Sequence, residues 1–178
     1  MTELLTTGAP GAESVDAYVR RNDGEESVSA RLEHLEGWGW RVLHSLRVGR
    51  SGTDVVDHLL IGPGGVFSIA TKDHTGSKVS VRDSGIVVND KDTDHLDAAR
   101  LQAERVSAVL TRETPWPVAV TPTVVILADT YVVKRLPQDV LVIRRGDAPN
   151  YFQRMPHIYC EEIVDWIYDT ACEPATWK

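Results

Sequence analysis

Two short apolar runs separated by a glycine-rich turn place the tightest limit on what this chain can fold into. The runs span residues 54–61 and 66–72, and both are rich in β-branched side chains. Between them stands Gly62-Pro63-Gly64-Gly65, in which proline fixes φ at one turn position and glycine tolerates positive φ at the next. Apolar runs of this length around such a turn predict two strands joined as a hairpin.

Two charged residues lie inside these runs, Asp57 in the first and Lys72 in the second. A charge in a buried strand costs free energy unless it is paired or used. Side chains alternate along a strand, so residues 70 and 72 point to the same face. Two interpretations of Asp57 and Lys72 stay open: they are parts of a functional site, or they form a buried ion pair retained for fold specificity.

The charge of the whole chain limits its partners. The formal net charge is −7 and the sequence pI is about 5.3. Tight, charge-driven binding of nucleic acid needs a basic surface, so the acidic net charge argues against this mode of binding. An enzyme that contacts DNA or RNA briefly is still compatible with this charge, because a bound divalent metal changes the local sign.

The cysteines and the N-terminus bear on the compartment. The first residues lack the positive region and apolar stretch of a secretory signal. No apolar run is long enough to span a bilayer, so we expect no membrane partner. Cys160 and Cys172 fall in one predicted helix about 18 Å apart, too far for a disulfide. Free thiols predict a reducing, cytoplasmic location.

Periodicity along the chain predicts an alternation of helices and strands. A helix opens near Asp23, carries an apolar stripe at Val28, Leu32 and Leu35, and stops at Gly37. The other predicted elements are strands over residues 41–48, 78–82, 85–88, 118–127, 132–133 and 140–143, and helices over residues 94–112 and 161–172.

These elements predict an α/β fold with a central mixed β-sheet flanked by helices. We expect residues 73–77 to form a turn between two strands, and Pro122 to delay the start of the long strand. Residues 21–178 are predicted to form a single domain. Residues 1–20 are predicted to form a flexible or partly helical N-terminal segment.

Four short motifs in this order resemble the nuclease-related domain (NERD) family of the PD-(D/E)xK nuclease superfamily. They are Gly24-Glu25 at the start of a helix, Asp57-His58 in one strand, the turn Gly-Pro-Gly-Gly-Val-Phe, and Thr71-Lys72 closing the next strand. The resemblance is most specific over residues 23–81 and weaker through residues 96–110. The closing Ala175-Thr176-Trp177 is similar to an actinobacterial branch of that family.

The resemblance implies a restriction-endonuclease-like core with a metal-dependent phosphodiesterase site. Asp57 is the expected direct ligand of Mg²⁺ or Mn²⁺, and Glu25 the expected partner that holds the metal or its water. Lys72 is expected to position or activate the attacking water. Carboxylate oxygens suit Mg²⁺, which also keeps several waters.

The sequence departs from the family pattern at position 70, where Ala70 replaces the expected second acid. Asp54 and Asp73 have the wrong strand parity to take its place, unless a bulge intervenes. Glu25 or Glu26 could approach from the helix. The missing acid predicts phosphodiester hydrolysis that is weak or absent.

Each of the site residues also has a structural interpretation. Asp57 can pair with Lys72, Lys72 can extend along an edge strand, and Glu25 can serve the helix dipole. His58 is expected to pack on the opposite face from Asp57. The alternative function is therefore a catalytically inactive nuclease-fold module that binds a protein or nucleic-acid partner; the acidic pI favours a protein.

Overall fold

The computed structural model describes residues 28–49 and 52–178. Glu25, Glu26 and the predicted segment 1–20 lie outside the described residues. In chain order the elements are a helical stretch over residues 28–33, η1 (His34–Trp38), β1 (Arg41–Val48), β2 (Asp54–Gly62), β3 (Gly65–Arg82), β4 (Gly85–Val88), β5 (Lys91–Asp92), α2 (His95–Glu113), β6 (Val120–Val133), β7 (Leu141–Arg144), α3 (Ala148–Gln153) and α4 (Glu161–Cys172).

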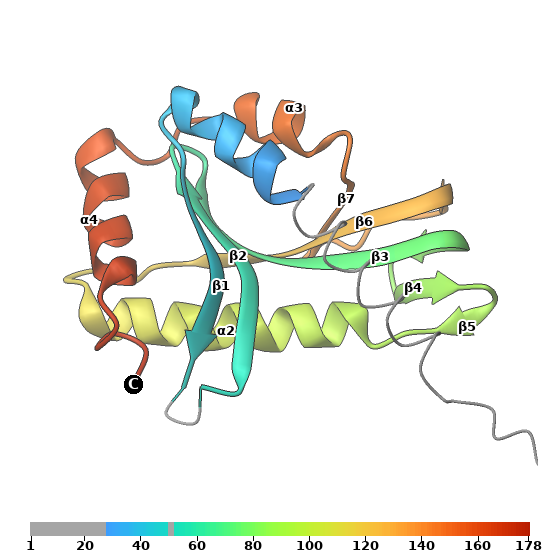
Figure 1. The fold of residues 1–178 in the computed structure, drawn as a ribbon, viewed down its shortest axis with the longest axis horizontal. Helices are drawn as coiled ribbons and strands as arrows, with labels where there is room; N and C mark the ends of the chain where they lie inside the picture. The colour runs from blue at the N-terminus through green and yellow to red at the C-terminus, as the bar shows by residue number, and fades with distance from the viewer. Residues whose placement is uncertain (1–27, 50–51) are drawn as a thin grey trace, which may run out of the picture.

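Strand β3 is the longest strand, with 18 residues, and it organises the seven-stranded sheet. On one edge it pairs in parallel with β6 along nearly its whole length, and β6 then pairs in parallel with β7. On the other edge β3 pairs antiparallel with β2 at its start and with β4 at its end. Figure 1 shows β1 and β2 turning away from β3, while β3 continues toward β4 and β5. The sheet is mixed and flanked by helices, as predicted from the sequence.

The two faces of the sheet carry separate hydrophobic clusters. One face packs against the helical residues 28–38 and α3, through Val28, Leu32, Leu35, Leu60, Phe67, Ile69, Val125 and Phe152. The other face packs against α2 and α4, through side chains that include Leu59, Ile61, Val79, Val81, Leu96, Ala99, Val106, Leu110, Val124, Ile126 and Ile167. In the described part of the chain, no helix has the length and apolar character needed to cross a lipid bilayer.

Four sequence-based expectations about element boundaries are wrong. Residues 118–127 and 132–133 do not form two separate strands, because β6 runs without a break from Val120 to Val133. Strand β3 does not stop at residues 73–77 but continues through an irregular register between His74 and Lys78. Strand β6 begins before Pro122, which lies opposite Ser68. Pairing with β7 starts only at Thr123, so proline occupies a position where the other side of β6 is still an edge. The first helical segment ends at Gly39, at φ 80°, rather than at Gly37.

The glycine-rich turn between β2 and β3 is a packing surface for Trp40. The Trp40 side chain is 2% exposed, and its ring lies 5.9 Å from that of Phe67. A Cβ added at Gly62 would lie 2.3 Å from two Trp40 ring atoms. The turn also anchors the segment before α4, because the carbonyl of Pro63 accepts the backbone N–H of Ile158 at 2.7 Å.

We therefore expect Gly62→Ala to lower the free energy of unfolding by about 1–3 kcal/mol, the usual cost of overpacking a filled core. Chemical denaturation monitored by Trp fluorescence measures the change. The matched control is Gly37→Ala, since an added Cβ at Gly37 meets no atom of the described residues within 4 Å. Equal stabilities of the two variants would contradict a packing role for Gly62.

Candidate functional site

Strands β2 and β3 separate at Asp57, and the residues around this point form what we call the fork (Asp57 with Ala70, Thr71 and Lys72). Regular pairing runs from Gly62 opposite Gly65 to His58 opposite Ile69, and then stops. One further step in this register would place Asp57 opposite Ala70. Instead, the backbone N–H of Thr71 donates to Oδ2 of Asp57 at 2.8 Å. The carboxylate thus accepts a hydrogen bond from β3 at the point where the backbone ladder ends.

Ala70 and Lys72 share one face of β3, the face that packs against α2. In the parallel register Ala70 lies opposite Val124 and Lys72 lies opposite Ile126. Both of these partners belong to the hydrophobic cluster that contains α2 residues. Ala70 is 8% exposed, and Lys72 is half-buried. The position expected to carry a second acid therefore holds a nearly buried methyl group beside a lysine.

Two histidines flank Lys72. Nε2 of His74 lies 2.9 Å from Nε2 of His95, the first residue of α2, and the rings stack with centroids 5.1 Å apart. The pKa of His95 is lowered from 6.5 to about 4, first by burial and then by the charges of Lys72 and His74, while Asp94 opposes the shift. Burial also lowers the pKa of His74. Near pH 7, then, Lys72 has two neutral imidazoles beside it.

A second pair of histidines lies on the opposite face of the fork. His58 is fully buried, and its Nδ1 lies 2.8 Å from Nδ1 of His44. Nε2 of His44 lies 3.2 Å from Oε1 of Glu33, and Nε2 of His58 lies 3.3 Å from Oγ1 of Thr71. Burial, and then His44, lower the pKa of His58 to about 3. This chain of polar side chains links the fork to the helical residues 28–33.

The position of His58 agrees with the packing interpretation made from the sequence. Its cross-strand neighbour Ile69 belongs to the cluster formed with the helical residues 28–38, not to the α2 side. Strand alternation alone was enough to separate His58 from the face of Ala70 and Lys72. Its partner His44 was not foreseen, because the contact depends on the register between β1 and β2.

Two of the acids that could replace the missing one are engaged away from the fork. Asp54 forms an ion pair with Arg105 of α2. Asp73 accepts hydrogen bonds from the backbone N–H of Thr75 at 2.9 Å and from its hydroxyl at 2.6 Å. The remaining candidates, Glu25 and Glu26, lie outside the described residues.

The ligand set for a divalent metal is incomplete in the part of the chain that the structure describes. No group of three or more His, Cys, Asp or Glu side chains in residues 28–49 and 52–178 is arranged to hold a metal. Asp57 brings one carboxylate to the fork, and Ala70 brings none. Mg²⁺ is usually bound through one or two carboxylates together with waters and substrate phosphates. The described residues alone therefore do not provide a two-carboxylate site.

Comparison with protein families matches a large part of the sequence to a known domain. The family model described as nuclease-related domain, NERD, matches residues 20–127, well over half of the chain. The chain belongs to the nuclease-related domain family. The matched range contains the whole fork and ends within β6, so β7, α3 and α4 lie beyond it. Comparison with curated proteins and with solved structures gave no match.

Membership of the nuclease-related domain family indicates a nuclease-related function and, in general, a divalent metal cofactor and nucleic-acid binding. Asp57 and Lys72, which the resemblance predicts as site residues, lie along the fork together with Ala70. The family match also covers Glu25. The two histidine pairs and the Thr71 N–H were not singled out from the sequence, because they acquire partners only in the folded sheet.

The depressed pKa of His95 gives a pH dependence of stability. Between pH 6.5 and about 4 the unfolded state binds a proton at this residue and the folded state does not, so stability is fully present above pH 6.5 and falls as the pH drops. We expect this contribution to be at most about 1.4 kcal/mol per pH unit.

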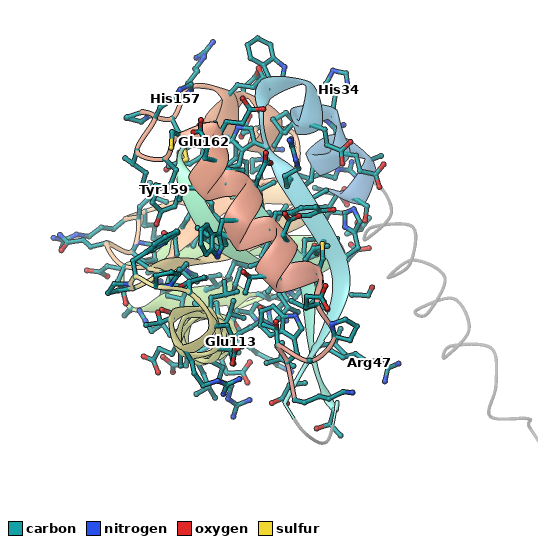
Figure 2. The ribbon with its side chains drawn as sticks, turned by 90° about the vertical axis from the view of Figure 1, so that its left-hand side faces the viewer. His34, Arg47, Glu113, His157, Tyr159 and Glu162 are labelled. Atoms are coloured by element: carbon teal, nitrogen blue, oxygen red, sulfur yellow. The ribbon has the colours of Figure 1, made fainter. Side chains whose placement is uncertain are left out.

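Urea denaturation of the wild type and of His95→Gln across this range measures the effect, and the variant should show the shallower dependence. His157→Gln is the control, because His157, labelled in Figure 2, is exposed. If the wild type and His95→Gln lose stability in parallel, His95 is not held neutral by the fold.

Proposed function

We propose that this nuclease-related domain carries a degenerate site, in which metal-dependent phosphodiester hydrolysis of nucleic acid is weak or absent. The observation that carries the proposal is the fork itself. Ala70, rather than an acid, occupies the β3 position next to the Asp57 carboxylate, and it lies on the same face as Lys72. Loss of one of two anionic ligands weakens a Mg²⁺ site, because oxygen ligands supply both charge and geometry.

Within this proposal, Asp57 and Glu25 are assigned to the divalent ion, Mg²⁺ or Mn²⁺, and Lys72 to the attacking water. The hydrogen bond from the Thr71 N–H supports the assignment of Asp57, since it orients the carboxylate at the end of the β2–β3 ladder. The position of Lys72 supports its assignment, because it lies on the same face of β3 as Ala70, two residues further along the strand.

The second candidate function is a catalytically inactive nuclease-fold module that binds a protein or nucleic-acid partner. The engagement of Asp54 and Asp73 by other groups favours it, because neither is available to replace the acid at position 70 without breaking those contacts. For either function we propose the cytoplasm as the compartment; Cys160 and Cys172 are both exposed free thiols, which suits a reducing environment.

Restoring the acid tests the degenerate site. We expect wild-type protein to cleave plasmid and single-stranded DNA or RNA weakly or not at all with Mg²⁺ or Mn²⁺. Ala70→Glu should raise the rate of metal-dependent cleavage by at least about tenfold. Even mutation of a residue that only hydrogen-bonds to a metal ligand changes metal affinity or activity by about 10- to 100-fold. Gel assays with and without EDTA provide the measurement.

Two further variants make the result specific. Adding Asp57→Ala to Ala70→Glu should abolish the gain, whereas Ala175→Glu, which adds the same charge at an exposed position near the C-terminus, should produce none. Thermal unfolding of each variant shows that it is folded. Inertness of folded Ala70→Glu with both metals would remove the nuclease assignment and leave the binding module.

A further inference from the structure

The far end of β3 presents a basic hollow on the face opposite Lys72. After the irregular register between His74 and Lys78, Val79 and Val81 pack toward α2. Alternation therefore turns Lys78, Ser80 and Arg82 to the other face. There a hollow of about 120 Å³ is lined by Lys78, Ser80, Arg82, Val87, Asp90, Val132 and Lys134. We call this the basic hollow.

Among the described residues, the cations that line the basic hollow outnumber the acids that line it. Lys78, Arg82 and Lys134 are exposed, and the ion pairs among residues 28–49 and 52–178 include none of them. The nearby Asp83 is paired with Arg135 at 3.4 Å. Three cations against the single carboxylate of Asp90 make a local positive site on a chain whose net charge is −7. Such a site attracts anions.

Ser80 adds an observation that does not depend on charge. Its Oγ is buried and has no hydrogen-bond partner among residues 28–49 and 52–178. Across the strands its neighbours are Val87 of β4 and Val132 of β6, which offer no side-chain acceptor. A buried hydroxyl without a partner costs roughly 1–3 kcal/mol, and such groups commonly mark the place of an ion or water. An oxyanion in the hollow would supply the acceptor.

We infer that the basic hollow binds a phosphate group in the backbone of a nucleic-acid strand. The inference rests on the proposed function in taking nucleic acid, rather than another phosphorylated molecule, as the ligand. The volume suits a single phosphate and is well below the roughly 300 Å³ from which small-molecule pockets begin. Lysine, arginine and hydroxyl donors are the groups that proteins place on phosphates.

The sheet topology connects the hollow with the fork. Within the described residues, β3 has no strand partner on the β2 and β4 edge between Ile69 and Val79. Lys72 lies in this open stretch, and Lys78 lies at its end. Six residues of strand span about 20 Å, a length that a few nucleotides of a single-stranded nucleic acid can cover. A single strand of nucleic acid that crosses this open edge of β3 can therefore contact the fork and the basic hollow at the same time.

Binding of a fluorescent single-stranded oligonucleotide, followed by anisotropy in EDTA to prevent turnover, tests the inference. For Lys78→Gln/Lys134→Gln we expect the Kd to rise about tenfold at 0.1 M salt. The slope of log K against log salt should shrink by about 1.4, because each phosphate contact on a single strand contributes about 0.7. The charge-matched control is Arg47→Gln/Lys178→Gln, which removes two exposed cations outside the hollow.

Ser80→Ala separates a phosphate contact from a structural role. The free protein should become more resistant to urea, because an unsatisfied buried hydroxyl is removed, while the Kd for the oligonucleotide rises about two- to tenfold. A purely structural serine would not move stability and affinity in opposite directions. Equal losses of affinity in the hollow and control variants, or an unchanged Kd in Ser80→Ala, would overturn the inference.

Inorganic phosphate, titrated by NMR, distinguishes the source of the anion. If phosphate shifts the Ser80 resonances and the oligonucleotide displaces it, the hollow is a site for the phosphate backbone of nucleic acid. If phosphate binds but the hollow variants leave the Kd for the oligonucleotide unchanged, the inference is overturned. The two proposals also fail separately. If Ala70→Glu is inert but the protein binds the oligonucleotide through the hollow, only the nuclease assignment is wrong. If the protein cleaves nucleic acid but the hollow variants do not change its affinity, only the inference about the hollow is wrong.

Discussion

The parallel pairing between β3 and β6 is the contact on which the rest of the sheet depends. Because β6 occupies one edge of β3 from Val66 to Val81, every other partner must share the opposite edge. Strand β2 takes the first part and β4 the last, so a stretch between them has no strand partner among the described residues. The fork is a consequence of this division, and the Asp57 carboxylate closes the β2 ladder where it ends. The candidate site thus comes from topology as much as from its charged residues.

Elements fixed by local periodicity could be predicted from the sequence, and elements fixed by distant pairing could not. The apolar face of α2 and the bounds of β1 and α4 follow from spacing within each segment. The passage of β3 through residues 73–77 and the inclusion of Pro122 in β6 depend on each strand having the other as its neighbour. Polar residues and proline predict the end of a strand when the segment is considered alone. They are tolerated within the strand when a long neighbouring strand pairs with it.

The same distinction applies to the site. Asp57 and Lys72 stood out because charge is costly in an apolar strand, and parity alone placed Ala70 and Lys72 on one face. The environment of these residues could not be predicted from the sequence, because one of the imidazoles beside Lys72 comes from β3 and the other from the start of α2. The basic hollow was hidden for a related reason. Lys78 and Lys134 lie far apart in sequence, and only the β3–β6 register brings them together.

The packing of Trp40 on the glycine-rich turn has a consequence for what the family relationship means. Gly62 and Gly64 lack side chains because Trp40 and Met155 occupy the space, and neither glycine has a part in the proposed chemistry. Packing alone is therefore enough to account for these two glycines of the turn. The residue at position 70 lies outside this packing, so an acid or an alanine there leaves the contacts of the turn unchanged. The features that identify the family and the residues proposed for hydrolysis are therefore different parts of the chain, the first shaped by packing and the second by charge.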